Sequence, residues 1–289
     1  MLIHSSIIAL ALQVGPNPVA PPPGAEEEML NRPPRETALE PELDEGSQWL
    51  VECLDLLGED ASRAHTMAQL QRNATTGTDR VLANHCLGPA ATELSLWEDA
   101  ATAFRAARDE TPDDEPSARA RFGIMAGNAV LASGDAERAV MLLDLAQDEA
   151  QRASNATLEA IAFTDMARAM VASSRPEEAL AQLDKAIALD PENPENWLLT
   201  ATLLRRLDRL GEAQDAIERA STLAPGNALI GLEAGVIAVL AGRDDAARAS
   251  WQSVIEIAPD SEAARTARDY LAQLGPPQPQ AQDAQEEPS

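Results

Sequence analysis

The sequence predicts an all-α fold, a solenoid of stacked two-helix units, from three observations. Proline recurs at intervals of 34 residues, at Pro191, Pro225 and Pro259. Alanine keeps the same interval, at Ala179, Ala213 and Ala247. A period of about 20–50 residues marks an array of stacked supersecondary units. Aromatic residues make up only 3% of the 289-residue chain, and alanine, leucine and glutamate dominate, as helices favour.

The unit 194–227 indicates why this period means two helices. A first apolar stripe, with spacings of four and three, contains Trp197, Ala201, Leu204 and Leu207. A second stripe contains Ala213, Ile217 and Ala220. Turn-compatible residues, 208–211, separate the two stripes. Pro225 ends the second helix because proline lacks an amide donor and disfavours helix in the residue before it.

Small residues at two register positions predict close contact between the helices of a unit. Ala201 on the first helix and Ala213 on the second occupy these positions, where a larger side chain would cost about 1–3 kcal/mol of strain. Gly235 takes the place of Ala201 one unit later, and Ala167 takes it one unit earlier.

The pattern of two successive units resembles the tetratricopeptide repeat family. The residues that carry the resemblance are Trp197, Ala201, Ala213, Ala220 and Pro225, then Gly235, Gly242, Ala247, Trp251 and Pro259. It implies a right-handed α-solenoid of helix-turn-helix repeats over 46–274, with about six repeats and a C-terminal capping helix. The best copies are 160–193, 194–227 and 228–261. The capping helix, 261–274, has polar residues on its outer side, as a terminal repeat needs for solubility.

Upstream of residue 160 the spacing is wider. Ala139 precedes Ala179 by 40 residues, and Ala100 precedes Ala139 by 39, which we expect to reflect longer second helices. The first unit, 43–73, is degenerate, and the sequence leaves open whether it is complete. It rests on few apolar residues: Trp49, Leu50, Leu54, Leu57 and Ala64.

The two ends of the chain differ from the array. Residues 15–45 and 275–289 are rich in proline and acidic residues, which predicts a disordered tether and a disordered tail. Residues 1–14 contain an apolar run that resembles the core of a secretory signal, although no Lys or Arg precedes it. We therefore expect an exported, periplasmic bacterial protein, with a cytoplasmic protein as the alternative. Membrane contact is expected only if this leader stays uncleaved.

The chain has two cysteines, Cys53 and Cys86, which fall on the first helices of neighbouring units. In an oxidising compartment they can form a disulfide worth about 3–4 kcal/mol. Two buried free thiols are the alternative. A zinc site that adds His65 and His85 matches no known zinc spacing, so we expect no metal.

Charge and motif content argue against several functions. With 48 acidic and 22 basic residues, the formal net charge is −26. Nucleic acid is therefore not an expected partner, since binding to phosphates needs clustered Lys and Arg. The chain has three histidines and no nucleophile elbow or phosphate loop. We expect no catalytic residues, no cofactor and no small-molecule substrate.

In tetratricopeptide arrays the first helices line a concave groove, and the resemblance transfers this role to positions two, five, nine and twelve of each unit. The partner-binding residues expected from it are Arg121, Asn128, Thr164, Arg168, Leu198, Thr202, Arg205, Leu232 and Val236. Arginine binds carboxylates through its planar fork, which favours a protein or peptide segment combining acidic and apolar residues. The alternative is that the arginines pair within the array, as Arg168 could with Asp165.

The sequence therefore predicts a non-enzymatic scaffold or adaptor that binds a partner segment in this groove. An oligomerising or regulatory subunit of a larger complex, with no groove ligand, is the alternative.

Overall fold

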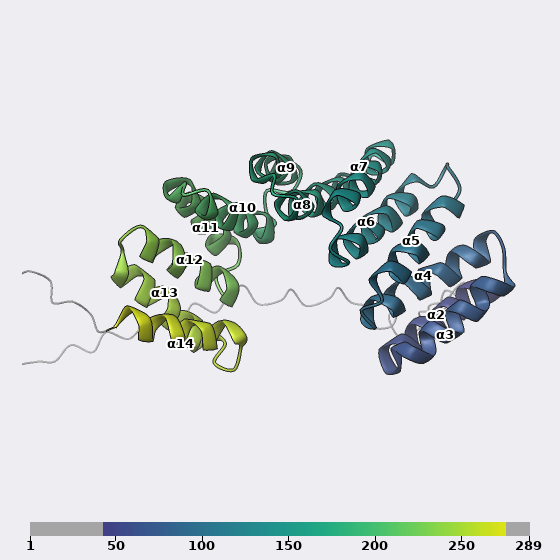
Figure 1. Ribbon diagram of the computed structural model, residues 1–289, viewed down its shortest axis with the longest axis horizontal. Helices are drawn as coiled ribbons and strands as arrows, with labels where there is room; N and C mark the ends of the chain where they lie inside the picture. Colours follow the sequence, from purple (N-terminus) through teal and green to yellow (C-terminus); the bar gives the residue numbers. More distant parts are fainter. Residues whose placement is uncertain (1–42, 276–289) are drawn as a thin grey trace, which may run out of the picture. The chain divides into compact units, whose positions relative to one another are not determined.

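The computed structural model describes residues 43–275, and this part consists of α-helices joined by short turns, without a β-strand (Figure 1). The helices are α2 (Glu45–Glu59), α3 (Ala61–Ala74), α4 (Thr78–Glu93), α5 (Trp97–Glu110), α6 (Pro116–Ala132), α7 (Ala136–Arg152), α8 (Ala156–Ala172), α9 (Pro176–Leu189), α10 (Pro194–Arg206), α11 (Leu210–Leu223), α12 (Ala228–Leu240), α13 (Asp244–Ile257) and α14 (Glu262–Leu274). Within this range no helix has the length and apolar character needed to cross a membrane. Apart from residues 43–45 and 275, the predicted leader, tether and tail lie outside the described residues.

Each even-numbered helix from α2 to α12 packs most extensively against the odd-numbered helix that follows it. These pairs are the hairpins of the array, and α14 packs against α12 and α13 at its end. One continuous apolar core runs from α4 to α12, and a second lies among α12, α13 and α14. The arrangement confirms the predicted all-α solenoid of helix-turn-helix repeats. We refer to the even-numbered members of the hairpins as first helices and to the odd-numbered ones as second helices.

Local sequence explains where the helices begin and end. Within the hairpins from α4–α5 onward, the chain reverses through a residue of positive φ, such as Gly134 (96°), Gly242 (71°) or Asp208 (60°). Between hairpins, the side chain of Asn193 accepts a hydrogen bond from the backbone nitrogen of Glu195 at the start of α10. A side-chain oxygen at this position satisfies an amide that has no partner inside the helix.

The small residues predicted at close helix contacts are buried within their hairpins. Ala201 and Ala213 are completely buried. A Cβ atom on Gly235 would lie 2.1 Å from Nε1 of Trp251, so the indole ring occupies the space of the missing side chain.

The wider upstream spacing has a different cause from the predicted one. The second helix α5 has 14 residues, the same as α9, α11 and α13. The first helices α6 and α8 have 17 residues, against 13 in α10 and α12. The expectation that second helices alone lengthen was wrong. The second helix α7 is longer, at 17 residues, but about one extra turn in each of α6 and α8 supplies most of the added spacing.

The N-terminal hairpin α2–α3 forms despite its degenerate sequence. Its core is small, because α2 buries Cys53 and α3 buries Ala64 and Ala68. The sulfur atoms of Cys53 and Cys86, the latter on α4, are bonded in a disulfide at 2.03 Å. This bond ties the first hairpin covalently to the first helix of the next one.

Candidate partner-binding face

The predicted groove residues lie on α6, α8, α10 and α12, and we call the surface formed by these nine side chains the first-helix face. Arg121 and Asn128 are exposed. The half-buried members are Arg168, Leu198, Thr202, Arg205, Leu232 and Val236. Thr164 is buried, with 6% of its surface exposed, and its hydroxyl lies 2.7 Å from Oδ1 of Asn196. That hydroxyl is therefore engaged inside the array.

Arg168 is neutralised by two carboxylates of the array. Its guanidinium forms ion pairs with Asp165 on its own helix and with Glu195 on α10. Nδ2 of Asn128, on α6, donates a hydrogen bond of 2.7 Å to Asp165. Burial raises the pKa of Asp165 above its ordinary value, while the Asn128 hydrogen bond and the charge of Arg168 act in the opposite direction. The three successive first helices α6, α8 and α10 are thus linked through one partly buried polar network.

Arg205 is paired in the same way. Its Nε lies 2.6 Å from Oε1 of Glu233 on α12, and both side chains are largely covered. The pairing considered in the sequence as the alternative to partner binding is therefore present at Arg168 and Arg205. The three arginines of the first-helix face, together with Arg206 beside it, are matched in number by four neighbouring carboxylates, Asp165, Glu195, Glu233 and Glu115. The face is close to neutral in a chain of net charge −26.

Three hollows lie between successive even-numbered helices, and most of their lining residues are apolar. The α8–α10 hollow, of about 190 Å³, is lined by Ala167, Arg168, Val171, Leu183, Leu199, Thr202, Leu203 and Arg206. The α12–α14 hollow, of about 360 Å³, is lined by Val236, Val239, Leu240, Trp251, Tyr270, Gln273 and Leu274. The α4–α6 hollow, of about 280 Å³, is lined by Thr78, Val81, Leu82, His85, Thr111, Pro112, Glu115, Ala118, Arg121, Phe122 and Met125.

Helix packing explains the position of two of these hollows. Close backbone contacts join α6 to α8 and α10 to α12, but they are few between α4 and α6 and between α8 and α10. The α4–α6 and α8–α10 hollows open at these two wider gaps.

The α4–α6 hollow combines apolar walls with an unpaired cation. Arg121 forms no ion pair with any residue of 43–275. His85 packs edge to face against Phe122, with ring centroids 5.3 Å apart. Burial, and then the charge of Arg121, lower the pKa of His85 below its ordinary value, so the imidazole is neutral at pH 7.

The sequence identified Arg121 but did not identify His85 or Phe122 as part of this site. His85 stands at position five of its unit, one of the positions expected to face the groove, so the register alone could have found it. The hollow itself depends on the distance between α4 and α6, for which the repeat pattern gives no signal.

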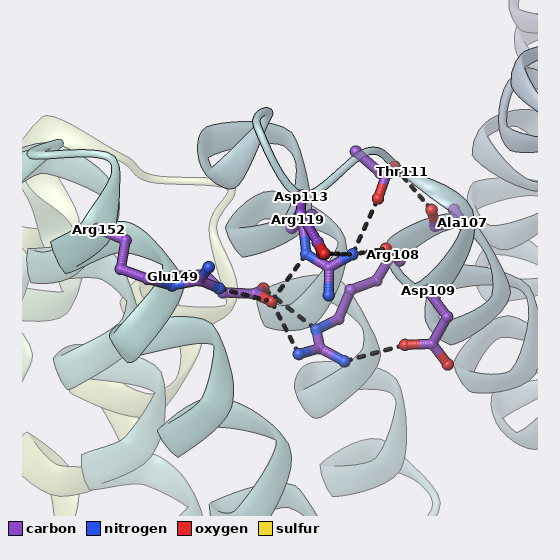
Figure 2. Close-up of polar contacts among 8 residues, drawn as sticks. All are labelled: Ala107, Arg108, Asp109, Thr111, Asp113, Arg119, Glu149 and Arg152. Atoms are coloured by element: carbon purple, nitrogen blue, oxygen red, sulfur yellow. Dashed lines mark hydrogen bonds and ion pairs between the residues drawn. The ribbon is translucent and has the colours of Figure 1, made fainter.

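A second polar site joins α5, α6 and α7, and it was also missed (Figure 2). Glu149 of α7 is 1% exposed. It accepts hydrogen bonds from Arg108 of α5, at 2.8 and 3.1 Å, and from Nε of Arg119 of α6, at 3.1 Å. Arg152 adds an ion pair at 3.4 Å. Both oxygens of the carboxylate are engaged, so this cluster holds two hairpins together and leaves no free base or ligand group.

The described residues offer little for metal binding. No three His, Cys, Asp or Glu side chains within 43–275 gather as metal ligands would. Cys53 and Cys86, considered above with two histidines as zinc ligands, are bonded to each other.

Comparison with known proteins agrees with this architecture. Residues 170–230 match the family described as tetratricopeptide repeat. Sperm-associated antigen 1 from Mus musculus is 34% identical over 103 residues, which cover 36% of this chain and 11% of the mouse protein. The chain therefore matches only a small part of that relative's length.

Two solved structures are similar in fold. PilF of Pseudomonas aeruginosa gives a TM-score of 0.59 at 16% identity, covering 78% of this chain and 97% of PilF. PilW, described as a widely conserved type IV pilus biogenesis factor, gives 0.62 at 17% identity, covering 78% of this chain and 99% of PilW. Identities this low indicate a shared fold and not a shared partner.

Proposed function

We propose that this chain, a member of the tetratricopeptide repeat family, is a non-enzymatic scaffold that holds a segment of a partner protein along its first-helix face. The observation that carries the proposal is the series of largely apolar hollows between successive even-numbered helices. Spaced hollows suit the side chains of one extended or helical segment, because each accepts an anchor residue while the ridges between them contact the backbone. Members of this family are generally scaffolds and not catalysts, which agrees with the absence of a catalytic motif from the sequence.

The charge distribution of the chain also favours the first-helix face as the surface that binds the partner. The formal charge of −26 repels acidic proteins from most of the molecule, whereas the arginines of the first-helix face cancel the carboxylates beside it. The cost of bringing up a protein segment is therefore lowest at this face. Arg121, the unpaired member, favours a segment that combines apolar residues with an acidic one.

The disulfide supports location in an oxidising compartment, and we propose the bacterial periplasm. Disulfides persist in exported proteins and are rare in the reducing cytosol. The bond between Cys53 and Cys86 is fully buried, which protects it from exchange with external thiols. The likeness in fold to two pilus proteins is compatible with a role in the cell envelope.

One observation favours an oligomerising subunit as the second candidate. Large apolar side chains are exposed on the second helices, among them Met141 and Leu145 on α7 and Ile257 on α13. Exposed apolar side chains of this size favour contacts with another protein.

Capture of the partner by crosslinking in cells separates the two functions. Ile161 on α8 and Leu229 on α12 stand at position two of their units, one of the positions expected to face the groove, and so border the first-helix face. They are 41% and 59% exposed, so Ile161→Asp and Leu229→Asp leave the core intact. Matched controls on the second helices are Met141→Asp and Ile257→Asp, at 61% and 49% exposure. A defined protein recovered with wild type and the controls, but lost with the first-helix variants, is the expected result. Loss of the captured protein with the second-helix variants alone would favour the oligomerising subunit, provided that light scattering shows a multimer that those variants dissociate.

A further inference from the structure

The α4–α6 hollow differs from the other two in its charge. Three further arginines line or flank the α8–α10 hollow, and two of them, Arg168 and Arg205, are held by carboxylates of the array. Arg121 stands in the second turn of α6, is exposed, and has no ion-pair partner within residues 43–275. In a chain with more than twice as many acidic as basic residues, an arginine without an ion pair can attract an incoming carboxylate.

Arg206, in the α8–α10 hollow, is the nearest comparison because it is also exposed and without an ion pair in the described range. It lies in the last turn of α10, where the carbonyl groups at the helix end partly offset a positive charge. Arg121 is far from the last turn of α6 and has no such compensation. Its charge is therefore the one more available to an incoming anion.

We propose that the α4–α6 hollow is a subsite for an acidic residue and its apolar neighbour in a partner segment. The carboxylate binds the guanidinium of Arg121, and the adjacent aliphatic or aromatic side chain enters between Val81, Leu82, Phe122 and Met125. The volume of about 280 Å³ lies at the lower limit of ligand pockets, about 300–1,000 Å³, which suits one or two side chains and not a folded domain. This inference rests on the proposed scaffold function and assigns one specific contact within it.

Glu115 restricts what the subsite accepts. It lines the same hollow from the turn between α5 and α6, yet it makes no ion pair with Arg121. A carboxylate on Arg121 is attracted by one group and repelled by the other, so a single acidic residue binds better than an acidic run. Removal of the charge in Glu115→Gln is therefore expected to tighten the binding of an acidic peptide.

His85 reports on the occupied state. The charged groups that line the hollow around it are Arg121 from α6 and Glu115 from the preceding turn, while Arg80 on its own helix is paired with Glu110 of α5. A carboxylate bound to Arg121 offsets the charge that, together with burial, keeps the imidazole neutral. The apolar side chain that enters beside it buries the ring further, so occupation changes both causes of the lowered pKa of His85. Nuclear magnetic resonance can follow this change through the His85 signal, which is assigned by its loss in His85→Gln.

The test uses the full chain and two matched peptides, acetyl-Gly-Glu-Leu-Phe-Gly-amide and its Gln counterpart, in calorimetric titrations. We expect the Glu peptide to bind about 2–5-fold more tightly than the Gln peptide, the range for an ion pair with an exposed arginine. Arg121→Ala is expected to abolish that difference, Arg206→Ala to preserve it, and Glu115→Gln to enlarge it. Because Arg121 is exposed, its variant keeps the fold, which circular dichroism verifies.

Equal affinity of Arg121→Ala and wild type for the Glu peptide, or no binding of either peptide at millimolar concentration, would overturn the subsite. Loss of binding in Arg206→Ala instead would place the contact in the α8–α10 hollow and refute it as well. The capture experiment separates this failure from a wider one. If the partner is still lost with Ile161→Asp and Leu229→Asp, only the Arg121 subsite is wrong. If capture of the partner is unchanged in those variants, the proposed scaffold function is wrong as well.

Discussion

Replacement of Glu149 by glutamine is expected to destabilise the middle of the array by about 3–5 kcal/mol, the cost of removing one partner from a buried ion pair. Glutamine has nearly the same shape, so the change removes charge and adds two donors without leaving a cavity. Arg108 and Arg119, whose side chains are 17% and 13% exposed, lose a shared carboxylate that is 2% exposed. Arg152, at 54% exposure, contributes little because water screens that pair.

The remaining contacts limit the loss to this range. Arg108 keeps its hydrogen bond of 2.9 Å to Asp109, and Arg119 keeps the carbonyl of Thr111 at 2.8 Å. Urea unfolding measures the global change, and hydrogen exchange of α5, α6 and α7 locates it, since repeat arrays lose stability locally. The matched control is Asp148→Asn, an exposed position on the same helix, for which we expect a change below about 0.5 kcal/mol. A Glu149→Gln protein as stable as this control would refute the reasoning.

Three further predictions follow from single residues. The folded-state pKa of His85 lies below its ordinary value, so its contribution to stability is complete above about pH 6.5 and is lost as the pH falls through the folded-state pKa. The variant His85→Gln is expected to flatten this part of the stability-versus-pH curve relative to wild type. Parallel curves for the two proteins would contradict the prediction. Reduction of the disulfide, or Cys53→Ala, is expected to lower the stability of the α2–α3 hairpin by about 3–4 kcal/mol, and exchange of its amides no faster than in the oxidised protein would count against this role. Gly235→Ala forces a Cβ atom against the indole of Trp251 and is expected to lower the stability by about 1–3 kcal/mol. Gly211→Ala, whose Cβ atom would have nothing within 4 Å, is expected to stabilise α11 by about 0.5–1 kcal/mol. Equal thermal unfolding midpoints for Gly235→Ala and wild type would show that the indole moves without cost.

The repeat could be predicted from the sequence because it depends on local properties of single residues, their size and their backbone hydrogen-bonding capacity. Ala201, Ala213 and Gly235 identify close helix contacts by size alone, and Pro225 marks a helix end by its missing donor. The cause of the wider upstream spacing could not be predicted, since a position in the register does not reveal which of two adjacent helices holds the extra turn.

Only part of the ion pairing of Arg168 and Arg205 could be predicted from the sequence. Asp165 lies three residues before Arg168, a spacing that a helix brings together, and the sequence predicted that contact as an alternative. Glu195 and Glu233 lie 27 and 28 residues after their arginines, slightly less than one repeat. Neighbouring first helices are stacked side by side, so acidic residues six or seven positions short of the period are the signal that could have shown these pairs. For Glu149 only the exposed pair with Arg152, three residues later, has a local signal. Its two covered partners, Arg119 and Arg108, are 30 and 41 residues away on helices of irregular length.

A near-neutral face on a strongly acidic molecule has a kinetic consequence that tests the charge argument as a whole. A segment with an acidic residue must approach through the field of a chain of charge −26 before it reaches Arg121, so long-range repulsion slows its association. Salt screens that field, with a Debye length of about 10 Å at 0.1 M and about 3 Å at 1 M. The contact with Arg121 is short-range and is weakened less. For the Glu peptide we therefore expect the association rate constant in stopped-flow measurements to rise with added salt, while the Gln peptide shows little change. An association rate that falls with salt would mean that a positive region larger than Arg121 attracts the ligand, and the view of the first-helix face as locally neutral would have to be abandoned.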